Sequence, residues 1–125
     1  MSDSLEKLKP SITVSLLGRE RSFRFSLKSC AQFQKLTKKS LLSGGIDIYD
    51  AEGLATLLWA GLIPDNKEFD GRIDSDGKPD ETIQKTIDEL LESLDLSDYA
   101  YLVNEVIGKA IQLAQPKEDP KKKGK

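Results

Sequence analysis

The chain has 125 residues, with 19 lysines and arginines against 21 aspartates and glutamates, one cysteine and no histidine. This length fits one domain with a hydrophobic core, and no apolar run approaches the roughly 18 residues that a membrane span needs. Since no signal peptide opens the chain and one cysteine cannot form an internal disulfide, we expect a cytoplasmic protein. Without histidine, the chain lacks the commonest general base and metal ligand, which argues against an enzyme. A net charge of −2 is also unlike that of a dedicated duplex-binding protein.

The near-neutral total hides a strong asymmetry along the chain. Residues 1–62 carry a net charge of +3, residues 63–115 a net charge of −8, and residues 116–125 a net charge of +3. The last segment is highly charged and poor in apolar residues, which is typical of a disordered end. We expect a flexible N-terminus over residues 1–10, a single domain over residues 11–115 and a disordered basic tail over residues 116–125. The asymmetry bears on partners and solubility rather than on fold.

Two stretches after Pro10 alternate between apolar and polar residues, with the link Gly18-Arg19-Glu20 between them. A period of two, interrupted by a glycine-containing turn, predicts a β-hairpin with one apolar face. The apolar positions are Ile12, Val14 and Leu16 in the first run and Phe23, Phe25 and Leu27 in the second. An isolated hairpin is only marginally stable in water, so we expect this face to pack on helices.

Two helices are predicted between the hairpin and Pro64. Ser29 is the expected N-cap of the first helix, which should end at Ser43-Gly44-Gly45. Its broken apolar stripe consists of Ala31, Phe33, Leu36 and Leu41. The second helix begins at Asp47 or Asp50, and its apolar residues are Leu54, Ala55, Leu57, Leu58, Trp59, Leu62 and Ile63. A helix that is apolar this far around is either central to the core or half-exposed as a docking surface.

Residues 64–80 form a long acidic loop with two prolines, two glycines and five aspartates. Its segment Asp74-Ser75-Asp76-Gly77 resembles part of an EF-hand calcium loop. Placing Gly77 or Gly71 at the sixth position of such a loop leaves Ile83 or Gly77 at the twelfth, where an EF-hand has a bidentate glutamate. We therefore expect a solvated loop, either functional or mobile, rather than a calcium site.

Two further helices are predicted after this loop. Asp80 should cap the first, whose stripe of Ile83, Ile87, Leu90, Leu91 and Leu94 is the most regular amphipathic signal in the chain. Ser97 should cap the last helix, which runs from Tyr99 to Ala114. Because only Asp95 and Leu96 join the two helices, we expect them to form an antiparallel pair. The prediction is thus an α+β fold, with an N-terminal β-hairpin packed on a mainly α-helical domain of about four helices.

No residue pattern for catalysis, for a cofactor or for a metal is found. Cys30 has no histidine to activate it and is expected in the core. Neighbouring carboxylates such as Asp88 and Glu92 are expected on the wet face of their helix. The sequence contains no P-loop, GxGxxG or GxSxG motif. We therefore expect a protein that is not an enzyme and has no catalytic residue, metal site or cofactor.

The basic residues allow a weaker hypothesis of nucleic-acid binding. The tail and the hairpin arginines Arg19, Arg21 and Arg24 are the candidate contacts. The alternatives are a solubilising tail and ordinary solvated strand positions, and these are the interpretation we favour.

Trp59 has two competing interpretations. Tryptophan in so apolar a helix usually packs in the core, but it is also over-represented among the residues that dominate binding interfaces. If the second interpretation holds, the helix around Trp59 and the stripe Ile83–Leu94 supply an apolar groove. The predicted contacts with a partner or a second copy of the chain are then Trp59, Leu58, Leu62, Leu90 and Leu94.

The order of these parts resembles a known family. The segment ITVSLLGRERSFRFSL runs into SCAQFQKL, then into GLATLLWAGL, and a variable polar loop and two further helices follow. This order is similar to that of the tail assembly chaperones of long-tailed bacteriophages and phage-derived gene-transfer particles. The resemblance covers residues 11–114, and its most specific part is Leu54–Leu62.

The resemblance implies a chaperone of the host cytoplasm that binds the tape measure protein, helps recruit tail tube subunits and leaves before the virion is complete. It also implies that a longer frameshifted form often exists, and the run Lys121–Lys123 is compatible with a slippery stretch of codons. Self-association into dimers or rings fits such a role. The alternatives are a tail-completion or head–tail connector protein that stays in the virion, and a nucleic-acid-binding regulatory adaptor.

Overall fold

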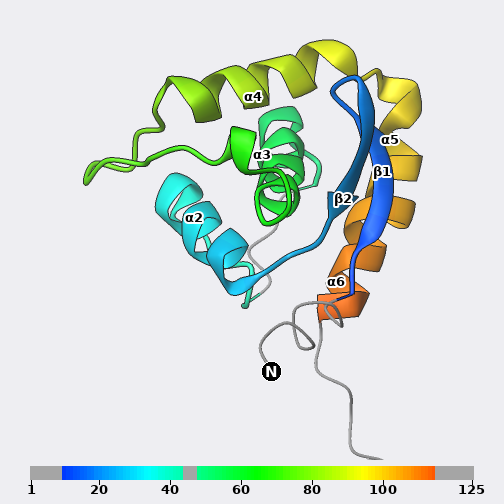
Figure 1. Ribbon diagram of the computed structural model, residues 1–125, viewed down its shortest axis with the longest axis horizontal. Coiled ribbons are helices and arrows are strands. Elements are labelled where there is room, and N and C mark those ends of the chain that lie inside the picture. Colours follow the sequence, from blue (N-terminus) through cyan, green and yellow to red (C-terminus); the bar gives the residue numbers. More distant parts are fainter. Residues whose placement is uncertain (1–9, 44–47, 115–125) are drawn as a thin grey trace, which may run out of the picture.

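The computed structural model describes residues 10–43 and 48–114 and has an α+β fold, as predicted (Figure 1). An antiparallel β-hairpin of β1 (Ile12–Leu16) and β2 (Arg19–Phe23) is followed by α2 (Leu27–Thr37), α3 (Ala51–Leu62) and α4 (Glu81–Ser93). The described part of the chain ends in a last helical segment, which consists of α5 (Tyr99–Tyr101), a π-helical stretch, η3 (Leu102–Ile107), and α6 (Gly108–Ala114). No helix in the described part is long and apolar enough to cross a membrane. The predictions for residues 1–9, Gly44, Gly45, Asp47 and the tail from 115 onward lie outside the described residues.

The hairpin turn begins one residue earlier and ends two residues earlier than the sequence pattern indicates. Ile12 pairs with Phe23 and Leu16 with Arg19, so that Leu17 and Gly18 alone form the turn, with φ angles of 54° and 92°. Two consecutive residues with positive φ match the right-handed twist of the strands, which favours this tight connection. The predicted link Gly18-Arg19-Glu20 is therefore wrong at its last two positions, which belong to β2. Phe25 lies beyond β2, and Leu27 is the exposed first residue of α2.

Helix α2 starts and ends earlier than predicted. Its N-cap is Ser26, and Ser29 is the third helical residue of a reciprocal capping box. The Ser29 hydroxyl also donates to the Ala60 carbonyl at 2.7 Å and so attaches α2 to α3. The helix ends at Thr37 because Lys38 adopts a left-handed conformation, with φ of 66°. Leu41 still packs against the core, but from the segment that follows the helix.

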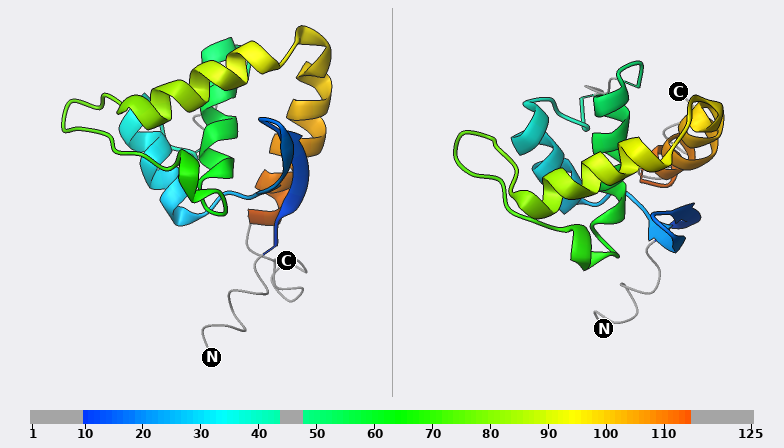
Figure 2. Two further views of the ribbon diagram at one scale, coloured as in Figure 1. Left: turned by 45° about the horizontal axis from the view of Figure 1, so that its top comes forward. Right: turned by 90° about the horizontal axis from the view of Figure 1, so that it is seen from above.

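Helix α3 is the centre of the molecule. It lies among α2, α4, β2 and η3 and is in contact with each of them (Figures 1 and 2). Every residue from Ala55 to Leu62 is buried. Asp50 caps its N-terminus by accepting a hydrogen bond from the Gly53 amide at 2.9 Å, as predicted. Gly61 lies against the ring of Phe23, so close that a Cβ atom there would lie 2.2 Å from the ring. The Arg24 amide donates to the Gly61 carbonyl at 3.0 Å, which holds the hairpin on this helix.

Helix α4 and the last helical segment do not form the predicted antiparallel pair. Asp80 caps α4 as expected, through a 3.1 Å hydrogen bond from the Ile83 amide. The last helical segment is preceded by a 3-10 turn, η2 (Leu96–Asp98), whose N-cap is Asp95. The Asp95 amide donates to the Asp98 carboxylate at 2.8 Å. The prediction of Ser97 as the cap is therefore wrong. Leu94 and Asp95 are both extended, so the chain turns a corner there and runs alongside the hairpin (Figures 1 and 2).

The acidic connection 64–80 is more ordered than the predicted solvated loop. It contains a 3-10 turn, η1 (Lys67–Phe69), and a β-bridge between Ile73 and Pro79. Phe69 is buried, and its carbonyl accepts a hydrogen bond from the Trp59 indole at 2.9 Å. Four aspartates of this connection accept hydrogen bonds that hold it in place. Asp65 accepts from Arg24 and Ser22, and Asp70 accepts from Lys28 and Gln32. Asp74 accepts from two amides of its own turn, and Asp80 accepts from the amides of Ile83 and Arg72.

Arg21 connects the hairpin to this connection from inside the protein. Its side chain is only 7% exposed, because its position in β2 shares the inward face with Phe23. Within the hairpin, the guanidinium donates to the carbonyls of Leu16 and Leu17 at 2.7 and 2.9 Å. Toward the connection, it donates to the Asn66 amide oxygen at 3.3 Å and to the Glu68 carboxylate at 2.8 Å. It also lies 4.6 Å from the centre of the Phe69 ring. The prediction of solvated arginines is therefore wrong for Arg21, and a buried cation persists here because each of these contacts compensates its lost hydration.

We expect Gly61→Ala to destabilise the protein by about 1–3 kcal/mol, the usual cost of overpacking a core. The added methyl group meets the Phe23 ring, which is itself buried and has no free space to move into. Urea unfolding measures the change. In the double variant, Phe23→Leu should recover part of the free energy of unfolding that Gly61→Ala removes. Strict additivity of the two free-energy changes would contradict the close contact.

We expect stability to fall on the acid side of about pH 4.5, the ordinary pKa of a glutamate. A backbone amide and the Arg21 guanidinium hold the pKa of Glu68 below this value, and backbone amides lower the pKa of Asp80 likewise. A carboxylate with a lowered pKa in the folded state stabilises the protein above its unfolded pKa and loses that contribution as the pH falls through the folded value. Urea unfolding between about pH 6 and 3 should therefore show a smaller decrease for Glu68→Gln than for the wild type. The matched control Glu89→Gln, on the exposed face of α4, should keep the wild-type decrease.

Candidate functional site

An apolar groove of about 280 Å³ lies where α3, α4 and the last helical segment meet. Its lining comes from the start of α3, the end of α4 and the corner that follows. The residues are Ile48, Tyr49, Asp50, Ala51, Leu54, Ala55, Leu58, Leu90, Leu91, Leu94, Asp95, Leu96, Tyr99 and Leu102. Most of these side chains are apolar, so the groove is suited to bind another apolar surface.

The floor and the rim of the groove differ in exposure. Leu58 and Leu90 form the floor and are fully buried by their neighbours, whereas Leu54, Leu91 and Leu94 are half-buried. At the rim, Tyr49 is 88% exposed and Leu96 is 89% exposed. Two large apolar side chains this exposed, next to a continuous apolar floor, are typical of a surface that another molecule covers.

Local backbone structure produces this arrangement. Helix α3 starts at Ala51 after its N-cap Asp50, so Tyr49 lies outside the helix, and its side chain is exposed. Leu96 opens the 3-10 turn η2 after the extended residues Leu94 and Asp95, which direct the chain away from α4. In η3, whose first residue Leu102 lines the groove, the π-helical hydrogen bond from the Gly108 amide to the Val103 carbonyl widens the last helix. Short π-helical stretches of this kind occur often beside functional sites.

The five predicted contact residues divide into two groups. Trp59 and Leu62 lie in the core with no exposed surface and do not line the groove. The core interpretation of Trp59 is therefore the one that the structure supports, and its indole nitrogen is used internally at Phe69. Leu58, Leu90 and Leu94 do line the groove, the first two as its floor and Leu94 at an accessible position.

Sequence reasoning missed the rim. Tyr49 and Leu96 lie outside the helical periodicities that were used to find apolar stripes, since each directly precedes or follows a helix-boundary aspartate. One signal in the sequence could have found these two residues: a large apolar residue next to a capping residue lies outside the helix, which therefore does not bury it. Tyr99 was found, but as a member of the last helix rather than as part of a site.

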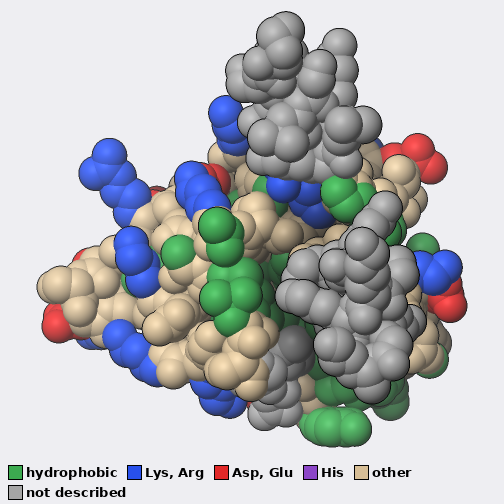
Figure 3. All heavy atoms as spheres, turned by 90° about the horizontal axis from the view of Figure 1, so that it is seen from below, with side chains coloured by type: hydrophobic (Ala, Val, Ile, Leu, Met, Phe, Trp, Pro, Cys, Tyr) green, Lys and Arg blue, Asp and Glu red, His purple; other side chains and the backbone are tan. Residues whose placement is uncertain are grey.

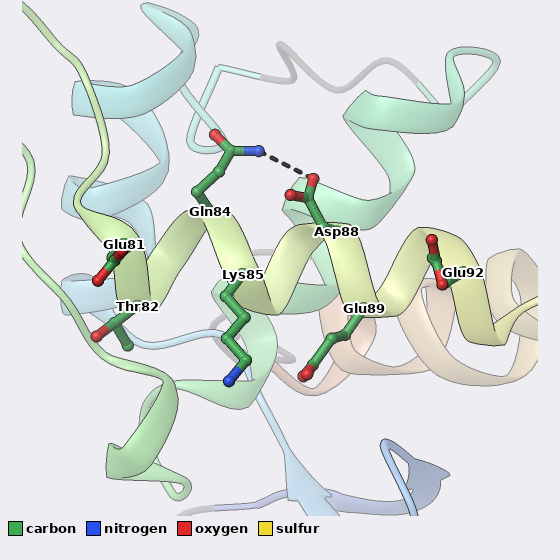
Figure 4. A pocket seen from close by; sticks show the side chains of 7 residues that line it. All are labelled: Glu81, Thr82, Gln84, Lys85, Asp88, Glu89 and Glu92. Atoms are coloured by element: carbon green, nitrogen blue, oxygen red, sulfur yellow. Dashed lines mark hydrogen bonds between the residues drawn. The ribbon is translucent and has the colours of Figure 1, made fainter.

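A larger and more open depression runs along the outer side of α4 (Figure 4). Its residues are Glu81, Thr82, Gln84, Lys85, Asp88, Glu89 and Glu92, and all of them come from this one helix. Gln84 donates to the Asp88 carboxylate at 3.0 Å, one helical turn away. A single helix face that no second element closes does not enclose a ligand, so we regard it as the wet face of α4. In the described part of the chain, no three histidine, cysteine, aspartate or glutamate side chains are grouped as metal ligands.

The remaining candidates for chemistry are dispersed. Cys30 is half-buried on α2, and burial raises the pKa of its thiol. The hairpin arginines are engaged by carboxylates: Arg19 and Arg21 by Glu68, and Arg24 by Asp65. Figure 3 shows hydrophobic side chains at the lower edge of one face and many lysine and arginine side chains over its left part.

Comparisons with known proteins found no family model, no curated protein and no solved structure that matches this chain.

We expect Trp59 to report its buried position directly, because it is the chain's single tryptophan. Its emission should be shifted to the blue, and iodide should quench it far less in the folded protein than in urea, since the indole has no exposed surface. Quenching of the folded protein as strong as that of the unfolded chain would contradict the core position. Addition of a groove-binding partner should leave the quenching of Trp59 unchanged.

Proposed function

We propose that this protein is a non-enzymatic tail assembly chaperone that holds an apolar, helical segment of the tape measure protein in its groove. The observation that carries the proposal is the groove at the junction of α3 and α4, with Tyr49 and Leu96 exposed at its rim. The order of hairpin, helices and loop supplies the link to the phage family. On this proposal the complex keeps the client soluble in the host cytoplasm and presents it to tail tube subunits.

The chemistry of the groove supports holding rather than transforming a client. Its floor is apolar, and its lining combines large aliphatic side chains with two tyrosines, Tyr49 and Tyr99. Aromatic and aliphatic anchors of this type dominate the free energy of protein interfaces. A groove between helices also accepts the apolar face of another helix, with contacts at the spacing i, i+3, i+4 and i+7.

The hairpin arginines do not favour the nucleic-acid-binding alternative. Arg21 is buried, and Arg19, Arg21 and Arg24 each have a carboxylate partner. Such pairing lowers the positive potential that would attract a phosphate backbone. The groove is thus the stronger basis for a function among the described residues.

We expect Leu96→Glu to reduce capture of co-expressed tape measure protein at least tenfold, because it places a charge on the apolar rim that the client must cover. Capture on the tagged chain, quantified from the same lysate, is the measurement. Leu27→Glu is the matched control, since Leu27 is also a mostly exposed leucine (79%) but does not line the groove. The free energy of unfolding of both variants should lie within about 0.5 kcal/mol of the wild-type value, as is usual for surface substitutions.

Two results would count against the proposal. If Leu96→Glu captures the client as well as Leu27→Glu does, the groove is not the binding site. If mass spectrometry finds the chain in purified virions at a fixed copy number, it is a structural connector rather than a chaperone.

A further inference from the structure

The charged residues that line the groove have one sign. They are Asp50 and Asp95, and no lysine or arginine of the described residues lines it. Neither carboxylate takes part in an ion pair with another described residue. Both residues are exposed as well as lining the groove, so solvent or a bound partner can reach them.

Each carboxylate is adjacent to one of the exposed apolar residues of the rim. Asp50 follows Tyr49 at the start of α3, and Asp95 precedes Leu96 at the corner after α4. An apolar anchor and an acidic group therefore stand side by side at two separate points of the rim. Both carboxylates also belong to helix caps: Asp50 caps α3 through the Gly53 amide, and Asp95 is the N-cap of η2, in a capping box with Asp98.

We infer that the groove selects a partner helix whose stripe of large apolar residues is flanked by lysine or arginine. The inference rests on the proposed function and specifies which segment of a client the chaperone takes. Long basic side chains lay their methylene groups along an apolar surface and extend their charge to its edge, which is where Asp50 and Asp95 stand. Rim charges of this kind add modestly to affinity, and they discriminate strongly against a partner of the same sign.

Other segments of this chain are poorer occupants. Residues 115–125 carry five lysines but no large aliphatic or aromatic side chain, so they match the rim and not the floor. The exposed Leu27 is followed by Lys28, whose ammonium is already paired with Asp70. A second copy of the chain offers no described helix with an exposed apolar stripe between unpaired cations, and it enters as one outcome of the test below.

The experiment uses the full chain and two synthetic helical peptides of equal length. Both carry the same stripe of leucines at i, i+3, i+4 and i+7; one has lysine at the flanking positions and the other has glutamate. Fluorescence anisotropy should show that the wild-type chain binds the lysine peptide about tenfold more tightly than the glutamate peptide, as a few exposed ion pairs allow. This preference should shrink as salt is raised, because screening acts on exposed charges.

Asp95→Lys should remove or reverse the preference between the two peptides. Glu89→Lys is the matched control, since it makes the same change of charge on α4 outside the groove and should keep the wild-type preference. Equal affinity for both peptides, binding of neither, or an unchanged preference in Asp95→Lys would each overturn the inference. So would sedimentation showing a dimer that Leu96→Glu dissociates, because the groove would then be covered by a second copy. Capture of the tape measure protein is measured separately, so the proposed function can survive such a failure.

Discussion

Burial of α3 on all sides is the constraint on which the rest of the structure depends. Every residue from Ala55 to Leu62 is buried, and a fully buried aliphatic or aromatic side chain contributes about 1.5–3 kcal/mol. A chain of this size has little other apolar surface with which to cover a helix. The hairpin, α2, α4 and the last helical segment therefore all have to place their apolar faces against it. Gly61 marks how close this packing is, since the Phe23 ring takes the space of a side chain there.

The groove follows from the same constraint, because the covering of α3 is incomplete at its first turn. Helix α4 packs against α3, and the chain then turns a corner at Leu94 and Asp95 instead of folding back. Leu54 and Leu94 are left half-buried, and Leu96 extends into solvent. A continuation of the core thus reaches the surface at one place, which is the physical basis for proposing a docking site there.

The hairpin and the acidic connection are held to α3 by polar contacts rather than by apolar area alone. Arg21 joins both with four hydrogen-bond acceptors, and Trp59 donates to the connection from the core. Removing one partner from such a buried network lowers the free energy of unfolding by more than the intact network contributes to it, because a desolvated polar group is left unpaired. The long connection is therefore an ordered part of the domain over its first half, despite its loop-like composition.

Local patterns in the sequence determined the hairpin, the approximate positions of the helices and the cap at Asp80, and they narrowed the cap of α3 to Asp47 or Asp50, because these features depend on residues within a turn or two of one another. The apolar character of α3 allowed either a central helix or a half-exposed one, and the tertiary structure decided for the core. Tertiary structure alone decided that Arg21 is buried, that α4 and the last helix meet at a corner, and that Trp59 faces Phe69 rather than a partner. The burial of Arg21 and the contact of Trp59 depend on groups that lie far apart in the chain. The corner depends on two extended residues, Leu94 and Asp95, which leave no periodic signal in the sequence. For the same reason, stripe reasoning found Leu58, Leu90 and Leu94, whereas Tyr49 and Leu96 became visible only when three helices were brought together.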